Sequence, residues 1–252
     1  MPSDTLTVIS DALTGDGPLD TATSRAVLRA VSRGDMGETF EIGVSSRVLA
    51  FGKHDTTADR FDDAVAVAVD HGFQPTVRIA GGRAAVFHEG TLRFGWTRPV
   101  PDAASSMYEG FEAMSKMVTQ TLGSFGIHSQ VGEIPGEYCP GSYSVHIAYR
   151  KVMGVGQRLM RNAAHVGGVL VLSNSQIIND VLVPIYDLLD LSFDPETTGA
   201  VSDAIDLDAE AVSQAFTKAV AVGRPMRHDE LPAVVKEEAE AFRNDHDPLV
   251  RP

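Results

Sequence analysis

The sequence of 252 residues contains a single cysteine, Cys139, and this scarcity excludes several kinds of site. One cysteine cannot form an intramolecular disulfide, and it is too few for a thiolate zinc site. No apolar run approaches the roughly 18 residues needed to span a membrane. The first residues lack the basic region and long apolar core of a signal peptide. We therefore expect a cytoplasmic protein without membrane contact.

Basic residues are also few: 21 Lys and Arg stand against 34 Asp and Glu, which gives a formal net charge of −13. Such a balance argues against a nucleic-acid partner. The centre of the chain nevertheless carries Arg150, Lys151, Arg158 and Arg161. These residues predict a local positive patch, with a solvated strand edge as the alternative.

Several familiar catalytic signatures are missing. The chain has no G-x-x-x-x-G-K-[ST] phosphate loop, no H-E-x-x-H, no C-x-x-C and no G-x-S-x-G. Gly154 and Gly156 alone do not complete a G-x-G-x-x-G. We expect no metal site.

The hydrophobic periodicity predicts helices and strands in alternating groups. Expected helices cover residues 19–33, 61–71, 105–125, 177–191 and 208–222, and the Met-rich side of the third is expected to face the core. Expected strands cover 39–51, 76–80, 84–97, 127–132, 143–149 and 166–172, with a short strand or turn around 152–157. The tail after Gly223 is charged and interrupted by proline, which predicts loose packing. This arrangement indicates an α+β fold with a mixed, largely antiparallel sheet flanked by helices.

Two glycine-containing loops are candidates for ligand binding. The first, R-I-A-G-G-R-A-A-V-F-H, covers 78–88, and the second, K-V-M-G-V-G-Q-R, covers 151–158. Glycine lets a backbone approach a ligand closely, and arginine can bind a phosphate or carboxylate. The alternatives are a tight turn with a surface arginine and a hairpin with a solvated lysine.

Cys139 lies in a loop rich in glycine and proline, twelve residues before Lys151. The thiolate is the nucleophilic form of cysteine, and a nearby cation favours it. This combination indicates acyl chemistry, whereas a small buried hydrophobic residue is the alternative.

Four segments together resemble the lipoate–protein ligase and octanoyltransferase family, which is related to biotin protein ligases. They are L-A-F-G-K-H-D at 49–55, R-I-A-G-G-R-A at 78–84, R-K-V-M-G-V-G-Q at 150–157 and A-H-V-G-G-V-L-V-L at 164–172. Their order and spacing agree with the family over about residues 25–200. The resemblance implies a catalytic domain over 1–200, similar to class II synthetases, followed by a C-terminal helix and a charged, flexible tail over 201–252.

The resemblance also implies the site. Cys139 and Lys151 are expected to be catalytic, with Lys151 holding the acyl carbonyl and neutralising developing charge. Residues expected to bind substrate are Arg78, Gly81, Gly82, Arg83, His88, Gly154, Gly156, Gln157, His165 and Gly167. The acyl chain is expected in an apolar tunnel that begins beside the loop at 81–82.

Three functions follow from the resemblance. In the first, Cys139 carries an octanoyl or lipoyl group as a thioester from an octanoyl carrier protein to the lysine of a lipoyl domain or of the glycine-cleavage H protein, and no cofactor is needed. In the second, the protein is a ligase that activates lipoate or octanoate with ATP and Mg²⁺ as an acyl adenylate. In the third, it binds acyl or lipoyl groups without catalysis, an alternative suggested by Val155 and Val166, which depart from the family pattern.

Overall fold

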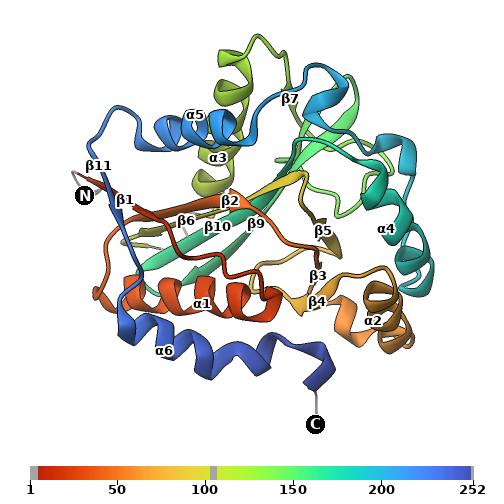
Figure 1. Ribbon diagram of the computed structural model, residues 1–252, viewed down its shortest axis with the longest axis horizontal. Coiled ribbons are helices and arrows are strands. Elements are labelled where there is room, and N and C mark those ends of the chain that lie inside the picture. Colours follow the sequence, from red (N-terminus) through yellow and green to blue (C-terminus); the bar gives the residue numbers. More distant parts are fainter. Residues whose placement is uncertain (1–4, 103–106, 251–252) are drawn as a thin grey trace.

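Two β-sheets organise the chain in the computed structural model, which describes residues 5–102 and 107–250 (Figure 1). The larger sheet consists, in spatial order, of β11 (Met226–Asp229), β1 (Leu6–Ile9), β2 (Thr39–Val44), β6 (Thr91–Pro99), β10 (Ala163–Val171), β9 (Arg150–Met160), β8 (Val145–Ile147) and β7 (Gln130–Val131). Strand β1 pairs in parallel with β11 and β2, and the other pairs are antiparallel. The predicted α+β class with a mixed, largely antiparallel sheet is confirmed.

The smaller sheet was not predicted as a separate unit. It consists of β4 (Gln74–Val77), β3 (Val48–Phe51) and β5 (Ala85–Phe87). The single strand expected over 39–51 is divided, because residues 45–47 interrupt it and send β2 and β3 to different sheets. The strand expected over 84–97 is divided in the same way at residues 88–90.

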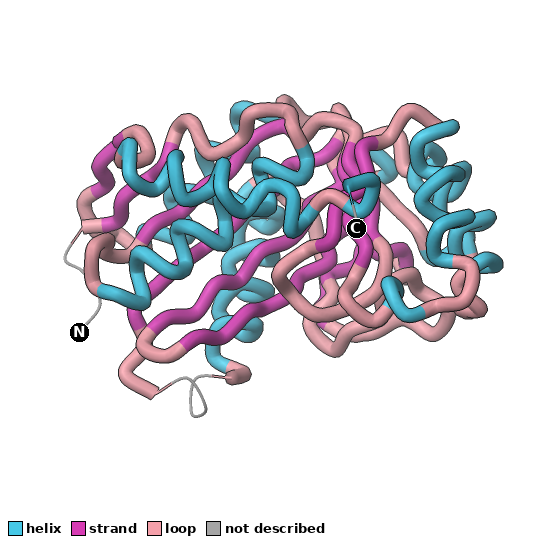
Figure 2. The backbone as a smooth tube through the Cα atoms, turned by 90° about the horizontal axis from the view of Figure 1, so that it is seen from below, coloured by secondary structure: helices cyan, strands magenta, loops and turns pink. Residues whose placement is uncertain are grey.

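Helices cover both faces of the larger sheet. Helices α1 (Gly17–Arg33) and α6 (Ala233–Phe242) lie on one face, as Figure 2 shows, and α3 (Glu109–Ser124) and α5 (Ala209–Ala221) lie on the other. Helices α2 (Phe61–Asp70) and α4 (Gln176–Leu188) cover the smaller sheet. Short 3-10 turns occur at Asp55–Thr57, Pro195–Thr197, Val201–Asp203, Arg243–His246 and Pro248–Val250. Within the described ranges, no helix is both long and apolar enough to cross a bilayer.

The main apolar core lies between the larger sheet and helices α3 and α5. Met114 and Met117 of α3 belong to it, so the Met-rich side of this helix faces the core as predicted. The ring of Phe216 from α5 packs edge-on against Phe40 and Phe94 of the sheet. Burying a side chain of this size stabilises the fold by about 1.5–3 kcal/mol. Residues 105–106, the start of the predicted helix, fall outside the described residues.

Helix α1 has clear signals at both ends, which is why its sequence prediction is nearly correct. The side chain of Asp16 accepts a hydrogen bond from the backbone N–H of Leu19, and Pro18 occupies the first turn. Gly34 ends the helix in the left-handed conformation at φ 83°.

Strand β9 is much longer than the short element expected over 152–157. It covers 11 residues and pairs with β8 through a tight hairpin whose two turn residues, Ala148 and Tyr149, have φ values of 47° and 61°. Two successive positive φ values are typical of a type I′ turn, which usually contains Asn-Gly. The Ala-Tyr pair carries no such signal, so the turn was missed.

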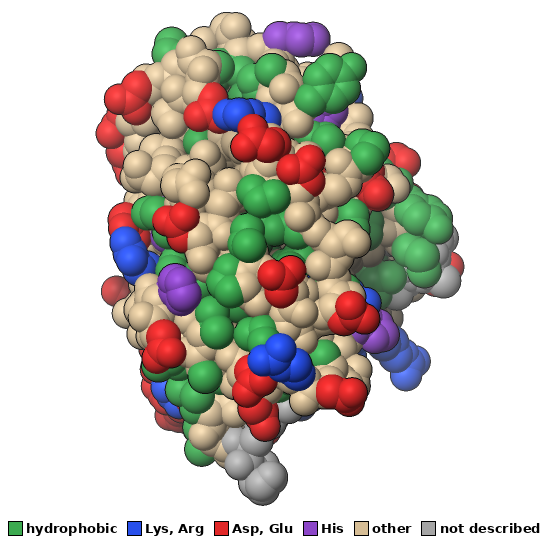
Figure 3. All heavy atoms as spheres, turned by 90° about the vertical axis from the view of Figure 1, so that its right-hand side faces the viewer, with side chains coloured by type: hydrophobic (Ala, Val, Ile, Leu, Met, Phe, Trp, Pro, Cys, Tyr) green, Lys and Arg blue, Asp and Glu red, His purple; other side chains and the backbone are tan. Residues whose placement is uncertain are grey.

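The prediction of a loose tail after Gly223 is wrong. Residues 226–229 form β11 at the edge of the larger sheet, and α6 packs against α1. Leu231, Val235 and Ala239 are buried there, while Glu238 pairs with two arginines of α1. Because α6 is short and its few apolar residues stand among many charged ones, the sequence contained no clear sign of this contact. The acidic character remains on the surface: in Figure 3, Asp and Glu side chains are spread over the side of the molecule that carries α2 and α4.

Candidate active site

Cys139 lies in the loop between β7 and β8 in an unusual backbone conformation. Its φ is 42°, in the left-handed region, where a residue with a side chain is disfavoured by about 1–2 kcal/mol. The backbone N–H of Cys139 donates to the hydroxyl of Tyr186 at 2.7 Å, and that hydroxyl donates to the carbonyl of Ala84 at 2.9 Å. These bonds fix the strained residue between α4 and the loop that follows β4. Strain of this kind is concentrated at functional sites.

Two donors approach the thiol from the loop between β4 and β5. Nη2 of Arg78 lies 3.1 Å from Sγ of Cys139, and the backbone N–H of Arg83 donates to the same sulfur at 3.2 Å. Burial by itself raises the pKa of the thiol. The positive charges of Arg78 and Lys151, together with the two hydrogen bonds, outweigh burial and leave the pKa of Cys139 below its ordinary value. The site therefore favours the nucleophilic thiolate.

The close approach of this loop depends on Gly82. Its φ is 105°, and a Cβ there would clash with Nη2 of Arg78 and lie 2.8 Å from Sγ of Cys139. Any side chain at this position would therefore displace either the guanidinium or the thiol. Nearby, a Cβ at Gly156 of β9 would lie 3.2 Å from the carbonyl oxygen of Gly81, so the loop also rests closely on this strand.

Lys151 binds the loop that contains Cys139 through hydrogen bonds from its ammonium group. Its Nζ donates to Oε1 of Glu137 at 3.1 Å and to the carbonyls of Tyr138 and Cys139, each at 2.9 Å. The side chain is 1% exposed. An ammonium group has three N–H donors, so the protein itself occupies all of them. Lys151 therefore shapes the loop and adds positive charge near the thiol.

Arg83 is anchored by Asp55. Nη1 of Arg83 lies 3.2 Å from Oδ1 of Asp55, whose other oxygen accepts from the backbone N–H of Gly52 at 2.8 Å. The Asp55 side chain is entirely buried. The segment at 49–55 and the loop at 78–84 are thus joined beside the thiol.

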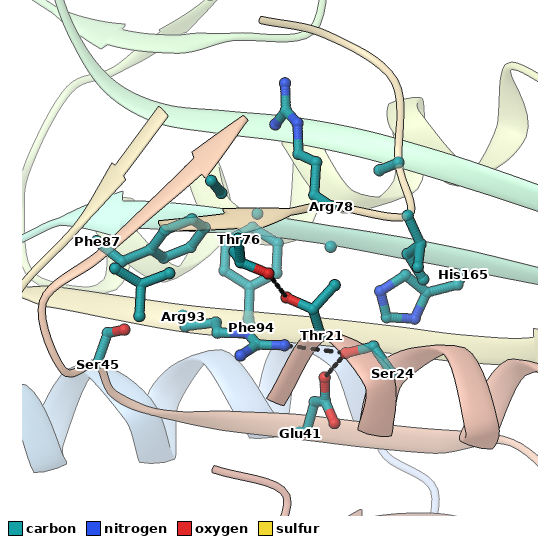
Figure 4. A pocket seen from close by; sticks show the side chains of 16 residues that line it. Thr21, Ser24, Glu41, Ser45, Thr76, Arg78, Phe87, Arg93, Phe94 and His165 are labelled. Atoms are coloured by element: carbon teal, nitrogen blue, oxygen red, sulfur yellow. Dashed lines mark hydrogen bonds between the residues drawn. The ribbon is translucent and has the colours of Figure 1, made fainter. Parts of the chain in front are cut away.

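Three hollows meet near Cys139. An open groove of about 310 Å³ passes over the thiol between Gly82 and Tyr143. A small cavity of about 20 Å³ lies on the inner side, between Cys139, Lys151 and Gly154. A third cavity of about 70 Å³ continues beneath the larger sheet towards α1 and shares Arg78, Phe87, Gly167 and Gly168 with the second (Figure 4).

Most of the residues expected at the site are close together. Those that line at least one of the three hollows, or contact the thiol directly, are Arg78, Gly81, Gly82, Arg83, Gly154, Gly156, Gln157, His165 and Gly167. His88 lines none of the three. It is buried in the turn after β5, where its Nδ1 accepts from the backbone N–H of Gly90 at 3.0 Å. Its role in binding substrate stays a prediction.

His165 lies in the third cavity, where Nδ1 is 2.8 Å from the hydroxyl of Thr97. Burial first, and then the charge of Arg93, lower its pKa to about 3. The imidazole is therefore neutral near pH 7.

Three residues of the site were missed by the sequence analysis. They are Asp55, Glu137 and Tyr186, which contact the predicted residues Arg83, Lys151 and Cys139, respectively. Asp55 stands inside the quoted L-A-F-G-K-H-D segment, and Glu137 lies two residues before Cys139, so proximity to these motifs was an available signal. Tyr186 contacts Cys139 from 47 residues away in the sequence, and no local pattern reveals it.

The basic residues expected to form one patch are separated. Arg150 begins β9, Arg158 lies near its other end with Arg161 in the turn that follows, and Lys151 is buried. Arg150 pairs with Glu196 and Asp203 at 3.7 and 3.6 Å. Arg158 instead lines a groove of about 460 Å³ that also contains Arg25, Arg29, Lys53, Asp245 and Arg78. The predicted single patch is wrong, because the length of an 11-residue strand was not recognised.

Solved structures with the same fold include a lipoate-protein ligase A bound with ATP. It superposes with a TM-score of 0.77 at 18% identity over 97% of this chain and 95% of that one. The protein Ta0514 from T. acidophilum, a putative lipoate protein ligase with bound lipoic acid, also gives 0.77, at 17% identity over 96% and 95% of the two chains. At these identities the comparison shows the fold alone.

The sequence is also similar to curated proteins that are named as acyltransferases. An Octanoyl-[GcvH]:protein N-octanoyltransferase of Geobacillus kaustophilus is 31% identical over 150 residues, which cover 60% of this chain and 53% of the relative. A Lipoyl-[GcvH]:protein N-lipoyltransferase of Listeria monocytogenes is 25% identical over 162 residues, 64% and 58% of the two chains. The matches span about half the length of such relatives. Residues 17–220 match the lipoyl protein ligase A/B catalytic domain, and the chain belongs to this family.

Proposed function

We propose that this protein is an acyltransferase that moves an octanoyl or lipoyl group onto the lysine of a lipoyl domain or of the glycine-cleavage H protein through a thioester on Cys139. The observation that carries the proposal is the environment of the only thiol. Cys139 has a strained backbone, a lowered pKa and two donors on its sulfur. The names of the relatives support an acyl donor and an acceptor of this class.

The first step forms the acyl-enzyme. The thiolate of Cys139 attacks the acyl carbonyl carbon, a C–S bond forms, and the bond between that carbon and the donor's leaving atom breaks. With an octanoyl carrier protein the leaving group is a thiol, and with an octanoylated H protein it is the lysine amine; either takes up a proton. In the second step the neutral lysine amine of the acceptor attacks the thioester carbon. A C–N bond forms, the C–S bond breaks, the amine loses a proton and the thiolate returns.

The oxyanion of each step develops on the acyl oxygen, which is one bond away from the carbon bonded to Sγ. Arg78 and the backbone N–H of Arg83 already lie at hydrogen-bond distance from Sγ, so they are the nearest donors for that charge. Lys151 would have to release Glu137 or one backbone carbonyl before it could bind an acyl oxygen. We therefore assign the oxyanion to Arg78 and Arg83, and the support of the loop to Lys151.

ATP-dependent ligation has less support in this chain. The groove over the thiol contains no Lys or Arg among its lining residues, so it offers no side-chain cation to a triphosphate. If ATP and Mg²⁺ bound here, Arg78 and Arg83 would be the cations within reach of the phosphates.

The test is intact mass spectrometry after incubation with an octanoyl carrier protein, with an octanoylated H protein, or with octanoate plus ATP and Mg²⁺, each with an apo lipoyl domain. The expected result is one octanoyl adduct on the protein and its transfer to the domain without ATP. Cys139→Ala removes both, whereas Ser213→Ala, on α5 and outside the three hollows, retains both. Transfer that survives in Cys139→Ala and requires octanoate with ATP would replace this proposal by the ligase. Binding of octanoate without any transfer would replace it by a non-catalytic role.

A further inference from the structure

The far end of the cavity beneath the larger sheet is polar. Figure 4 shows Ser24 of α1 beside Glu41 of β2 and Arg93 of β6, while the guanidinium of Arg78 points away from them. Since that guanidinium contacts Cys139, the polar group lies at the end remote from the thiol. The apolar tunnel implied by the family resemblance is therefore apolar only in part, on the side of Phe87, Phe94 and Ile79.

This polarity is unusual for its position. A helix and a sheet ordinarily meet through apolar side chains. The second half of α1 follows that rule, with Ala26, Val27 and Ala30 in an apolar cluster. The first half instead packs polar side chains against the sheet: Asp20, Thr21, Ser24, Glu41, Thr97 and His165 are buried, and the side chain of Arg93 is 14% exposed. Burying such groups costs free energy unless they are paired, so each polar atom of this set needs a partner.

The polar groups hold one another in a fixed arrangement. Oε1 of Glu41 accepts from the hydroxyl of Ser24 at 3.0 Å, and Nη2 of Arg93 lies 3.0 Å from the same hydroxyl. Arg93 also donates to the carbonyl of Asp20 at 2.8 Å and lies 3.5 Å from its carboxylate. The side chains are thus positioned before any ligand arrives.

A glycine brings Glu41 and His165 together. A Cβ at Gly95 of β6 would lie 2.5 Å from Oε1 of Glu41 and 2.9 Å from Cε1 of His165. Oε1 and Cε1 are therefore at most 5.4 Å apart, so the carboxylate of Glu41 and the imidazole of His165 are neighbours in the cavity. Any larger residue at position 95 would push the two side chains apart.

Both side chains retain hydrogen-bonding capacity. Oε1 of Glu41 is bonded to Ser24, but its second oxygen receives no hydrogen bond from any described residue. His165 uses Nδ1 for Thr97, and its Nε2 likewise has no partner within residues 5–102 and 107–250. Glu41 is 7% exposed and His165 is 4% exposed, and both line the cavity. A ligand atom that both donates and accepts hydrogen bonds would complete them.

We propose that Glu41 and His165 select an acyl chain that carries a hydroxyl group at its far end, in preference to an unsubstituted chain. The proposal rests on the function proposed above, since it identifies the acyl group that Cys139 would carry. The thioester end lies at Cys139, the chain follows Phe87 and the glycines of β10, and its terminal hydroxyl reaches Glu41 and His165. Ser24, which is bonded to both Glu41 and Arg93, positions the carboxylate.

The test compares matched free acids by isothermal titration calorimetry: hexanoate with 6-hydroxyhexanoate, and octanoate with 8-hydroxyoctanoate. In at least one pair we expect the hydroxy acid to bind about tenfold more tightly, which corresponds to about 1.4 kcal/mol. Glu41→Leu should reverse this preference, and Glu41→Gln, which keeps the volume and hydrogen bonding, should retain most of it. Glu38→Gln is the matched control, because Glu38 is also a buried carboxylate next to β2 but does not line this cavity.

Equal or weaker binding of both hydroxy acids to the unmodified protein would overturn the inference, whether or not Glu41→Leu folds. The same protein is then incubated with the N-acetylcysteamine thioesters of these acids, and Cys139 is examined by mass. A binding preference without any adduct would reject the proposed transferase reaction and leave the selectivity of the cavity standing. An adduct formed equally well from plain and hydroxylated chains, with equal binding, would reject the selectivity alone.

Discussion

The ammonium nitrogen of Lys151 lies 3.1 Å from Oε1 of Glu137, and both side chains are almost completely shielded from solvent. Glu137 is saturated in turn: Oε1 also accepts from Ser144 at 2.7 Å and from the backbone N–H of Gly141 at 3.1 Å. The pair therefore links β9 to both sides of the cysteine loop. A buried pair of this kind contributes less to stability than its geometry suggests, but breaking it is costly.

We expect Lys151→Met to destabilise the protein by about 3–5 kcal/mol, because it leaves the carboxylate of Glu137 buried without a cation. Chemical denaturation measures this difference in the free energy of unfolding. Lys116→Met, at an exposed position of α3, is the control and should change stability by less than about 0.5 kcal/mol. If the two variants were equally stable, Lys151 would not support the loop as described.

The reactivity of Cys139 should depend on Arg78. Because the pKa of the thiol is lowered, its alkylation by iodoacetamide should reach half of the maximum rate at a lower pH than for a free cysteine. Arg78→Leu removes the largest of the lowering influences, so the midpoint should move to higher pH and the rate at pH 7 should fall about tenfold. The measurement is the alkylation rate followed by mass at a series of pH values.

Arg60→Leu is the matched control for that experiment, since Arg60 is exposed and pairs with Asp63 at the start of α2. Its pH midpoint should equal that of the unmodified protein. An unchanged midpoint in Arg78→Leu would show that the guanidinium does not stabilise the thiolate.

The fold could be predicted where the chain carries local signals. Helix α1 has a capping aspartate, a proline in its first turn and a terminal glycine, and its bounds were nearly correct. The hairpin between β8 and β9 uses Ala148 and Tyr149 in positive φ, a pair without a recognisable turn signal. Because this turn was not predicted, neither the length of β9 nor the separation of Arg150 from Arg158 could be predicted.

The site could be predicted only in part, for a similar reason. Arg78, Arg83 and Cys139 stand in short motifs, and the structure brings them together. The polar cavity end is assembled from α1, β2, β6 and β10, and each of its residues is unremarkable in its own segment. Glu41 is one residue of a strand pattern in the sequence, and only the pairing of β2 with β6 places it against Gly95.

Glu41 gives stability a distinctive dependence on pH. Burial raises the pKa of its carboxyl above 4.5, although Arg93 and Ser24 oppose the change. When the pKa of a carboxyl is higher in the folded protein than in the unfolded chain, the group contributes to stability at pH values below its pKa in the unfolded chain. This contribution is lost as the pH rises through its pKa in the folded protein. Glu41→Gln should therefore raise the Tm at pH 7 by about 2–4 °C, the effect of roughly 1 kcal/mol in a chain of this size.

The gain should shrink towards pH 4, where the carboxyl of the unmodified protein is already protonated. Thermal unfolding at pH 4 and pH 7 measures both differences. The exposed Glu240→Gln on α6 serves as control and should leave the Tm unchanged at either pH. A gain from Glu41→Gln that is the same at both pH values would mean that Glu41 does not titrate differently in the folded and unfolded states.

Arg150 and Arg158 should differ in their effect on docking of an acidic acceptor domain. They are eight residues apart on β9, a distance of about 27 Å at about 3.4 Å per residue. Arg158 is exposed in the groove that leads to Arg78, whereas Arg150 is already paired with Glu196 and Asp203. Charges at the edge of an interface act mainly on the association rate, and salt screens them within about 10 Å at 0.1 M.

We therefore expect Arg158→Glu to slow acyl transfer to an acidic lipoyl domain about tenfold at low ionic strength, with the difference fading as salt approaches about 0.5 M. Arg150→Glu, which reverses the same charge on the same strand, should slow it by less than about twofold. The measurement is kcat/KM for the acceptor across a series of salt concentrations. Equal losses in the two variants, or a rate that ignores salt, would place the docking surface away from the groove of Arg158.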